Sequence, residues 1–483
     1  STSGTSNFIA GVNAGNSITS GGNYNTVVGD EAGTAITTGD ENTAVGYRAL
    51  DASTTANYNT AVGKDAAGAT TTGNSNTAMG RFALLTNTEG DANTALGRDA
   101  LRANTTADNN TAVGYASLTA NTTGASNTAV GYSAVAANTT GIQNTSIGGF
   151  SLASNTTAAG NTAIGFGTLY TNTTGASNTA VGLNALNLST TASNNTAVGM
   201  HALVANTTGA SNTAVGRHSM LTNTTGASNV ATGVNSLYYN TTGDFNVALG
   251  VQALTTNTTA NNNTALGYQS LLSNSTGASN TAVGANALDA NTTASNNTAV
   301  GTSALGANTT GTRNTAVGTN AGDGITTGSY NSLFGVHAGS SITTGAVNCA
   351  FGDYTLAANT TASYNTALGQ SSMGQTTTGS NNTAVGYNSL YSNTTGEFNT
   401  AVGKNALTAN TTGYRNTAIG HEAGANTTTG QYNISIGFEA QSSSATVYGQ
   451  CTLGNAQTAA IRCNVQSISA LSDSRDKTDV IDS

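Results

Sequence analysis

One motif, Asn-Thr-Ala-Val-Gly, recurs every 17 residues from Asn25 to Asn433 without an insertion or deletion. Its 25 copies vary in sequence but not in spacing. A period this short and strict is typical of solenoids, because each repeat stacks on the next and a slip would unstack all that follow. A degenerate copy begins 18 residues earlier, at Asn7. We therefore expect a stack of 17-residue rungs that starts near the first residue.

The composition suits such a stack better than a globular enzyme. Charged residues make up 7% of the 483 residues, against about 25% in ordinary soluble domains. Proline is absent, as expected where nearly every backbone N–H donates to a ladder. The net charge is −9 and only 12 residues are Lys or Arg, which argues against nucleic acid as a partner. No stretch has the pattern of a transmembrane helix, so no membrane insertion is expected.

The repeat reads N-T-A-V-G-x-x-A-L-x-x-N-T-T-G-x-x, and we number its positions one to seventeen. Positions one to four alternate and predict a short strand, and the invariant Gly at position five predicts a turn. Position fifteen is Gly or Ala from Gly39 to Gly430 and predicts a second corner. Helix is excluded because a 3.6-residue apolar period is absent and Gly, Asn and Thr disfavour helices. The predicted fold class is all-β, a parallel β-solenoid.

Two kinds of side-chain contact are predicted from the repeat. Asn at position one should form an amide ladder from rung to rung, as stacked Asn does in other parallel β arrays. Position nine is usually Leu and position twelve usually Asn, but in some copies Gly at nine accompanies Ile at twelve. These copies are Gly15 with Ile18, Gly33 with Ile36, Gly322 with Ile325, and Gly339 with Ile342. The exchange keeps the apolar volume nearly constant, which predicts that the two positions share one interior pocket.

The strand is apolar on both of its faces. Positions three and four carry apolar residues in almost every copy, as in Ala44 and Val45. Consecutive strand residues point to opposite faces, so both faces should be buried. One face can line the solenoid interior, and the other needs a neighbour, most simply the same surface of a symmetry mate. We therefore expect a closed homo-oligomer, a trimer.

The rungs over about residues 7–440 resemble two known groups of repeats. The Asn-Thr-Ala-Val-Gly…Ala-Leu pattern is similar to the head repeats of trimeric autotransporter adhesins and to rungs of phage tail fibres. The adhesin heads form left-handed parallel β-rolls in trimers, although their repeats are commonly shorter. The resemblance implies a left-handed, homotrimeric solenoid.

A second resemblance lies near the C-terminal end of the sequence. Residues 470–480, Ala-Leu-Ser-Asp-Ser-Arg-Asp-Lys-Thr-Asp-Val, are similar to the opening of the intramolecular chaperone domain of endosialidase-type phage tail spikes and fibres. That family trimerises through the chaperone and then cuts itself at a Ser-Asp bond. The resemblance implies Ser472-Asp473 as the scissile pair, Ser472 as nucleophile and Lys477 as base, since a desolvated Lys can accept the hydroxyl proton. The alternative is a polar segment with a chance Ser-Asp pair.

The sequence thus predicts three parts. Residues 1–440 form the shaft, residues 441–470 lose the 17-residue register and form a small β cap, and residues 471–483 begin the chaperone-like segment. Cys451 and Cys463 in the cap are expected to be buried apolar thiols, since no CxxC or His partner is near; the alternatives are a disulfide between them or a metal site.

Cys349 replaces the Thr at position two and is also expected to be buried. No metal or other cofactor is predicted for any part of the chain. Adjacent His201 and His218 should point outward, which disfavours a metal site there.

Positions six and seven, just after the Gly corner, collect the unusual side chains. Turns on a rigid scaffold often carry binding. Lys64, Arg81 and Arg98 occupy position six of successive rungs, so they should stack as a basic column compensated by neighbouring Asp65 and Asp99. The candidate binding residues for a glycan or sulfate are Lys64, Arg81, Arg98, Tyr115 and Tyr132. The alternative is a solvated face with paired charges.

No enzyme motif is present in the sequence. It contains no phosphate-binding Gly loop, His-Glu-x-x-His, calcium loop or nucleophile elbow. We expect a structural fibre of a phage tail, located on the virion, that forms a rigid trimeric rod and contacts a host-surface receptor such as a glycan. Its only enzymatic activity would be one self-cleavage in a longer precursor. The alternatives are a bacterial adhesin on the extracellular surface or an ice-binding solenoid, the latter suggested by the files of Thr at positions two, thirteen and fourteen.

Overall fold

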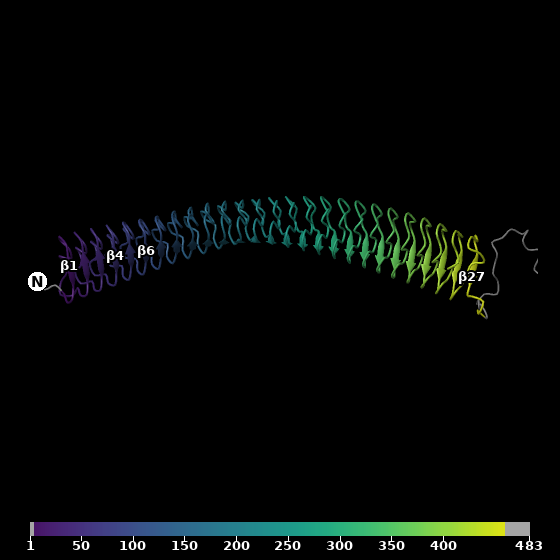
Figure 1. Cartoon of the computed structure of the whole chain (residues 1–483), viewed down its shortest axis with the longest axis horizontal. Helices are drawn as coiled ribbons and strands as arrows, with labels where there is room; N and C mark the ends of the chain where they lie inside the picture. The colour runs from purple at the N-terminus through teal and green to yellow at the C-terminus, as the bar shows by residue number, and fades with distance from the viewer. Residues whose placement is uncertain (1–3, 459–483) are drawn as a thin grey trace, which may run out of the picture. The chain divides into compact units, whose positions relative to one another are not determined.

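A computed structural model describes residues 4–458 of the chain. These residues form three-residue strands joined by turns, with no α-helix, so the described chain has no helix that could cross a membrane. Two compact units divide the chain, Ser1–Asn348 and Cys349–Ser483. In Figure 1 one short strand recurs in every turn of the backbone. The predicted all-β, parallel solenoid of 17-residue rungs is confirmed.

The strands of the first unit are β1 (Phe8–Ala10), β2 (Thr26–Val28), β3 (Thr43–Val45), β4 (Thr60–Val62), β5 (Thr77–Met79), β6 (Thr94–Leu96), β7 (Thr111–Val113), β8 (Thr128–Val130), β9 (Thr145–Ile147), β10 (Thr162–Ile164), β11 (Thr179–Val181), β12 (Thr196–Val198), β13 (Thr213–Val215), β14 (Val230–Thr232), β15 (Val247–Leu249), β16 (Thr264–Leu266), β17 (Thr281–Val283), β18 (Thr298–Val300), β19 (Thr315–Val317) and β20 (Ser332–Phe334). The strands of the second unit are β21 (Cys349–Phe351), β22 (Thr366–Leu368), β23 (Thr383–Val385), β24 (Thr400–Val402), β25 (Thr417–Ile419), β26 (Ile434–Ile436) and β27 (Cys451–Leu453).

Within each unit every strand pairs in parallel with the next one along the chain. Thr43 lies opposite Thr60 in the pairing of β3 with β4, which is one 17-residue step. The pairing of β1 with β2 sets Phe8 opposite Thr26, and so confirms the 18-residue step to the degenerate first copy. Like residues therefore stack in files from rung to rung.

The 17-residue register also continues beyond residue 440. Ile434 lies opposite Cys451 in the pairing of β26 with β27, so the predicted loss of register is wrong as far as Leu453. Gln450 replaces the usual Asn at position one. The register survives because the backbone N–H of Gln450 still donates to the Oδ1 atom of Asn433 at 2.9 Å. The remainder of the predicted cap, residues 459–470, and residues 471–483 lie outside the described residues.

The interior is made of small apolar side chains and amides. Ala at position three is fully buried, as at Ala44, and so is Leu at position nine, as at Leu50. Residues at positions two and four, such as Thr43 and Val45, lie on the opposite face and are partly exposed. The predicted division of each strand into an inner and an outer face is confirmed.

The Gly corner and the Asn ladder hold neighbouring rungs together. Gly46 has a φ of 131°, and a Cβ atom there would lie 2.7 Å from the carbonyl oxygen of Gly63. The amide of Asn42 donates to the Oδ1 atom of Asn25 at 3.1 Å and to the carbonyl of Ala56 at 2.8 Å. The predicted ladder is confirmed. A second ladder runs through position twelve and was not predicted; in one step Asn104 donates to Asn87 at 2.8 Å.

The pocket shared by positions nine and twelve is also confirmed. A Cβ atom added to Gly33 would lie 2.8 Å from the Cδ1 atom of Ile36, and one added to Gly339 would lie 2.8 Å from that of Ile342. The Ile side chain therefore fills the space that Leu occupies in other rungs. Leu333, at position three of the rung that contains Gly339, reaches the same space, with its Cδ2 atom 3.0 Å from the added Cβ.

Candidate functional site

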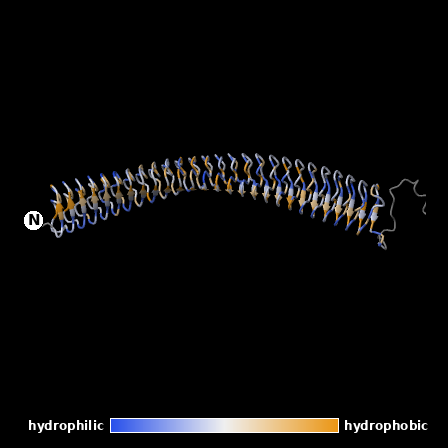
Figure 2. Cartoon of the chain, viewed as in Figure 1, coloured by the Kyte–Doolittle hydropathy of each residue, from blue (hydrophilic) through white to orange (hydrophobic). Residues whose placement is uncertain are grey.

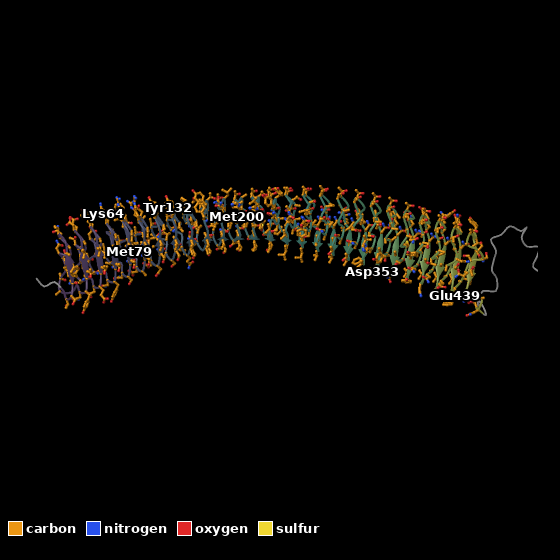
Figure 3. All side chains as sticks on the ribbon, viewed as in Figure 1. Lys64, Met79, Tyr132, Met200, Asp353 and Glu439 are labelled. Atoms are coloured by element: carbon orange, nitrogen blue, oxygen red, sulfur yellow. The ribbon has the colours of Figure 1, made fainter. Side chains whose placement is uncertain are left out.

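The five predicted binding residues lie in one exposed column of the first unit. We call Lys64, Arg81, Arg98, Tyr115 and Tyr132 the position-six stripe; all five are exposed. The column is regular because the N–H at position seven of each rung donates to the carbonyl at position six of the rung before. Phe82, for example, donates to the carbonyl of Lys64 at 3.0 Å. Lys64 and Tyr132 are labelled in Figure 3.

The basic part of the stripe is partly neutralised. The Nζ atom of Lys64 lies 3.8 Å from Asp65, and the Nε atom of Arg98 lies 3.1 Å from Asp99. The predicted compensation by these two carboxylates is therefore confirmed. Arg81 takes part in no ion pair among the described residues, and its guanidinium lies 4.4 Å from the ring centre of Phe82. Arg81 is thus the cation of the stripe that remains available to an anionic ligand.

The aromatic part of the stripe forms an ordered platform. The rings of Tyr115 and Tyr132 stack with their centres 5.3 Å apart and their planes 10° apart. Arg98 lies over Tyr115 at 5.5 Å, while Phe150 meets Tyr132 edge to face at 5.1 Å. The cations and the aromatic rings of the stripe therefore meet where Arg98 lies over Tyr115.

A shallow groove of ≈330 Å³ continues from this platform and was missed by the sequence reasoning. Its lining residues are Phe150, Phe166, Gly167, Tyr170, Asn184 and Asn187. It is hollow because Gly167 occupies position seven, where neighbouring rungs carry a side chain, and Asn187 donates to the carbonyl of Gly167 at 2.7 Å. The rings of Phe150 and Phe166 meet edge to face at 5.8 Å. The signal in the sequence was the Gly residues, Gly149 and Gly167, beside two Phe at positions six and seven.

The two adjacent histidines form a stacked pair. The rings of His201 and His218 are 5.5 Å apart and 9° from parallel. Both side chains are half-buried. Burial lowers the pKa of His218, and the nearby charge of Arg217 and then that of His201 lower it further.

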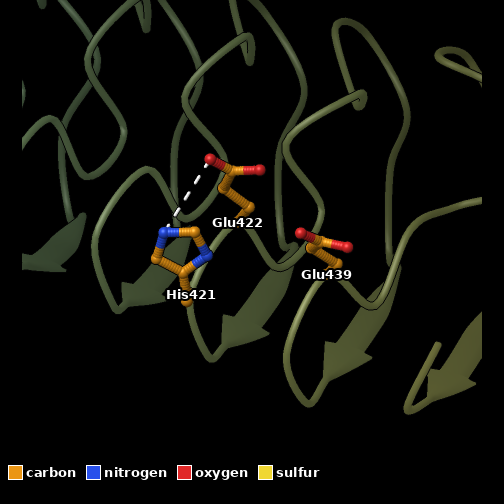
Figure 4. A group of neighbouring side chains, drawn as sticks. All are labelled: His421, Glu422 and Glu439. Atoms are coloured by element: carbon orange, nitrogen blue, oxygen red, sulfur yellow. Dashed lines mark ion pairs between the residues drawn. The ribbon is translucent and has the colours of Figure 1, made fainter. Parts of the chain in front are cut away.

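A group of side chains that could hold a metal ion lies in the second unit (Figure 4). His421, Glu422 and Glu439 each offer one donor atom, and these atoms lie within 4.8 Å of one another. His421 occupies position six of one rung, Glu422 position seven of that rung, and Glu439 position seven of the next. The sequence reasoning missed this group because Glu439 lies 17 residues after Glu422. Stacking in register was the signal that could have revealed it.

The two described cysteines are exposed in the single chain, so the prediction that the chain itself buries them is wrong. Cys349 and Cys451 each begin a strand, at position two, and this position points away from the interior. The third cysteine, Cys463, lies outside the described residues. The same holds for Ser472, Asp473 and Lys477, the residues of the predicted self-cleavage site.

Comparison of the chain with protein-family models and with curated proteins finds no match. A functional assignment therefore depends on the geometry of the rungs and on the two motif resemblances.

Proposed function

We propose that the chain forms a homotrimeric shaft of a phage tail fibre that takes part in attachment to the host surface. The observation that carries the proposal is the outer strand face, which we define as positions two and four of strands β2–β27. No charged residue occurs at these positions. Several of them are large apolar side chains that are about 40% exposed in the single chain, including Met79, Leu96 and Ile147. Figure 2 colours many of these strands toward the hydrophobic end of its scale.

A row of apolar side chains at position four, repeated on almost every rung, requires a cover. Single soluble proteins rarely expose contiguous apolar patches larger than a few hundred Å². The occupant that fits best is another copy of this chain, because only a partner with the same 17-residue rung can match the face step by step. Three copies around an axis would place the outer strand face of each copy against the other two copies. The resemblance of residues 470–480 to a trimerising chaperone domain supports the same state.

Sedimentation equilibrium tests the assembly. The full chain should sediment at about three times its mass of 47.5 kDa. Placing Lys at both Val300 and Val317, on the outer strand face of adjacent rungs, should dissociate the trimer, because buried like charges are costly. The matched control puts Lys at Thr302 and Thr319, the exposed position-six residues of the same rungs, and should leave it intact. A stable wild-type monomer would refute the proposal.

We assign host attachment to the position-six stripe, which suits an anionic glycan. Sugar rings can lie on the stacked Tyr115 and Tyr132, while a sulfate or carboxylate group can pair with Arg81. An immobilised sulfated polysaccharide is a direct probe. Arg81→Ala should weaken its retention, and Arg313→Ala, which removes an exposed Arg on a distant rung, should not. Equal loss in both variants would indicate non-specific charge attraction and contradict the assignment.

A second candidate function is ice binding, which the regular Thr files favour. Thr at position fourteen is exposed, as at Thr38 and Thr208, and repeats on successive rungs. Regularly spaced hydroxyl and methyl groups can order water on a flat surface. The two functions are distinguished by a thermal hysteresis measurement: freezing-point depression beyond the colligative value would favour ice binding, and its absence would favour the fibre.

A further inference from the structure

We propose that His421, Glu422 and Glu439 form a binding site for one divalent transition-metal ion, for which Zn²⁺ is the appropriate probe. Glu422 and Glu439 extend from position seven of adjacent rungs, and His421 extends from position six beside Glu422, as Figure 4 shows. The site joins two rungs of the second unit. It is independent of the proposed fibre function.

The donor atoms are already close to a coordinating arrangement. The Nε2 atom of His421 lies 3.8 Å from the Oε1 atom of Glu422, and the three donor atoms lie within 4.8 Å of one another. Donors around a tetrahedral zinc ion are about 3.4 Å apart, given bond lengths near 2.1 Å. Glu439 is exposed, so its side chain can rotate the remaining ångström or so without disturbing the packing.

Neighbouring side chains hold the first two donors in place. The amide of Asn405 donates to the Oε1 atom of Glu422 at 3.3 Å, and that of Gln441 donates to the Glu422 carbonyl at 2.7 Å. The imidazole of His421 stacks on Phe438 at 5.2 Å with the rings 10° from parallel. Outer partners of this kind fix ligand orientation in metal sites and reduce the cost of ordering the ligands on binding.

Buried polar atoms without a partner mark the same place. The Nδ1 atom of His421 and the Oγ1 atom of Thr452 are both buried and make no hydrogen bond in the described structure. Thr452, Glu422 and Glu439 line a polar hollow of ≈640 Å³. Such atoms are costly unless something else satisfies them. With the Nε2 atom of His421 on the metal, the water of a hydrated ion held beside this hollow by Glu422 and Glu439 would satisfy the hydroxyl of Thr452.

The charges of the group favour a cation. Carboxylates at one position of adjacent rungs repel each other, and neither glutamate forms an ion pair with a Lys or Arg among the described residues. Lys404, at position six of the preceding rung, forms no ion pair with either glutamate in the described structure. One imidazole with two carboxylates selects Zn²⁺ and similar ions over Mg²⁺ and Ca²⁺, which prefer all-oxygen sites.

Equilibrium dialysis of the full chain against Zn²⁺ tests the site. The parent protein should carry Ser in place of Cys349, Cys451 and Cys463, because free thiols also bind zinc. It should bind one Zn²⁺ per chain with little competition from Mg²⁺. Glu439→Gln should weaken this binding by about tenfold or more, and His421→Gln should act in the same direction. His218→Gln, which alters the stacked pair of His201 and His218 far along the chain, should leave the binding unchanged.

Two outcomes would overturn the site. The first is the absence of stoichiometric Zn²⁺ binding to the parent protein. The second is binding that survives Glu439→Gln or is lost in His218→Gln. Because Glu439 is exposed, its replacement by Gln should preserve the fold, and circular dichroism checks this. Thermal unfolding gives a second readout, since Zn²⁺ should raise the unfolding temperature of the parent but not that of Glu439→Gln.

Discussion

At the scale of single residues, the Gly at position five is the least replaceable part of the rung. Gly216 has a φ of 130°, a conformation that side-chain-bearing residues rarely adopt. A Cβ atom there would also lie 2.6 Å from the carbonyl oxygen of Gly233. Neither the backbone nor its neighbour can give way without breaking the hydrogen bonds between rungs. This accounts for the invariance of Gly through all 25 copies.

A matched pair of substitutions tests this explanation. Gly216→Ala should lower the unfolding free energy by about 1–3 kcal/mol from backbone strain alone, and by more through the steric contact. Gly306→Ala at position ten should cost much less, because φ there is not positive, an added Cβ atom would lie 3.3 Å from its nearest neighbour, the carbonyl oxygen of Ser303, and other rungs carry Ala, such as Ala136. Denaturant unfolding measures both. Equal destabilisation would show that the conformation at position five is not the constraint.

The titration of His218 is a second prediction at this scale. Burial and the nearby charges lower its pKa, so the folded protein favours the neutral ring, and the unfolded chain binds a proton first as the pH falls. The contribution of this group to stability is therefore complete above about pH 6.5, the ordinary His pKa, and is lost as the pH falls below it. His201→Asn should raise the pKa of His218. An NMR titration with His218 at or above the ordinary value would contradict this.

At the scale of the rung, the pocket shared by positions nine and twelve can be tested by exchange. Ile325→Asn should destabilise the protein by about 2–5 kcal/mol, because it removes fully buried apolar volume and leaves a buried amide. Adding Gly322→Leu should recover part of the loss. Recovery should be incomplete, because a Cβ atom at Gly322 would lie 2.8 Å from the Cδ1 atom of Leu333. Strictly additive effects of the two changes would show that the positions do not meet.

Much of the rung could be predicted from its own repetition. The strand, the Gly corner, the Asn ladder and the shared pocket each left a pattern in 25 aligned internal copies. The left-handed conformation of non-Gly residues could not be predicted, because no local preference favours it at Leu203 (φ 52°) or Ser211 (φ 60°). Stacking enforces it: Leu203 donates to the carbonyl of Ser219 in the next rung at 3.0 Å.

The same reasoning explains the errors at the candidate sites. The prediction that the chain buries Cys349 was wrong because position two points away from the rung interior. The metal-ligand group was missed because Glu422 and Glu439 are neighbours only across rungs. The groove was missed because it results from a side chain that is absent, at Gly167. Only the contacts between rungs, and not the order of residues along one rung, reveal such features.

At the scale of the whole molecule, self-cleavage is a prediction based on the resemblance of residues 470–480 to the chaperone family. A precursor extended by such a domain should trimerise and then release its C-terminal part after Ser472. Ser472→Ala or Lys477→Ala should block release without preventing assembly, since the proposed nucleophile and base act after folding. Mass spectrometry of the expressed precursor gives the outcome. An intact precursor in a sample that has trimerised, or cleavage at another bond, would remove this support for a phage fibre.

The central claim is that the uncharged outer strand face is buried against other copies of the chain. Electron cryo-microscopy of the purified full chain tests it most directly, because it shows both the number of copies and the direction of the strands. We predict three copies around a threefold axis, with positions two and four, such as Thr298 and Val300, turned toward neighbouring copies. A single copy with these side chains in solvent, or an assembly joined through the position-six stripe, would contradict the claim.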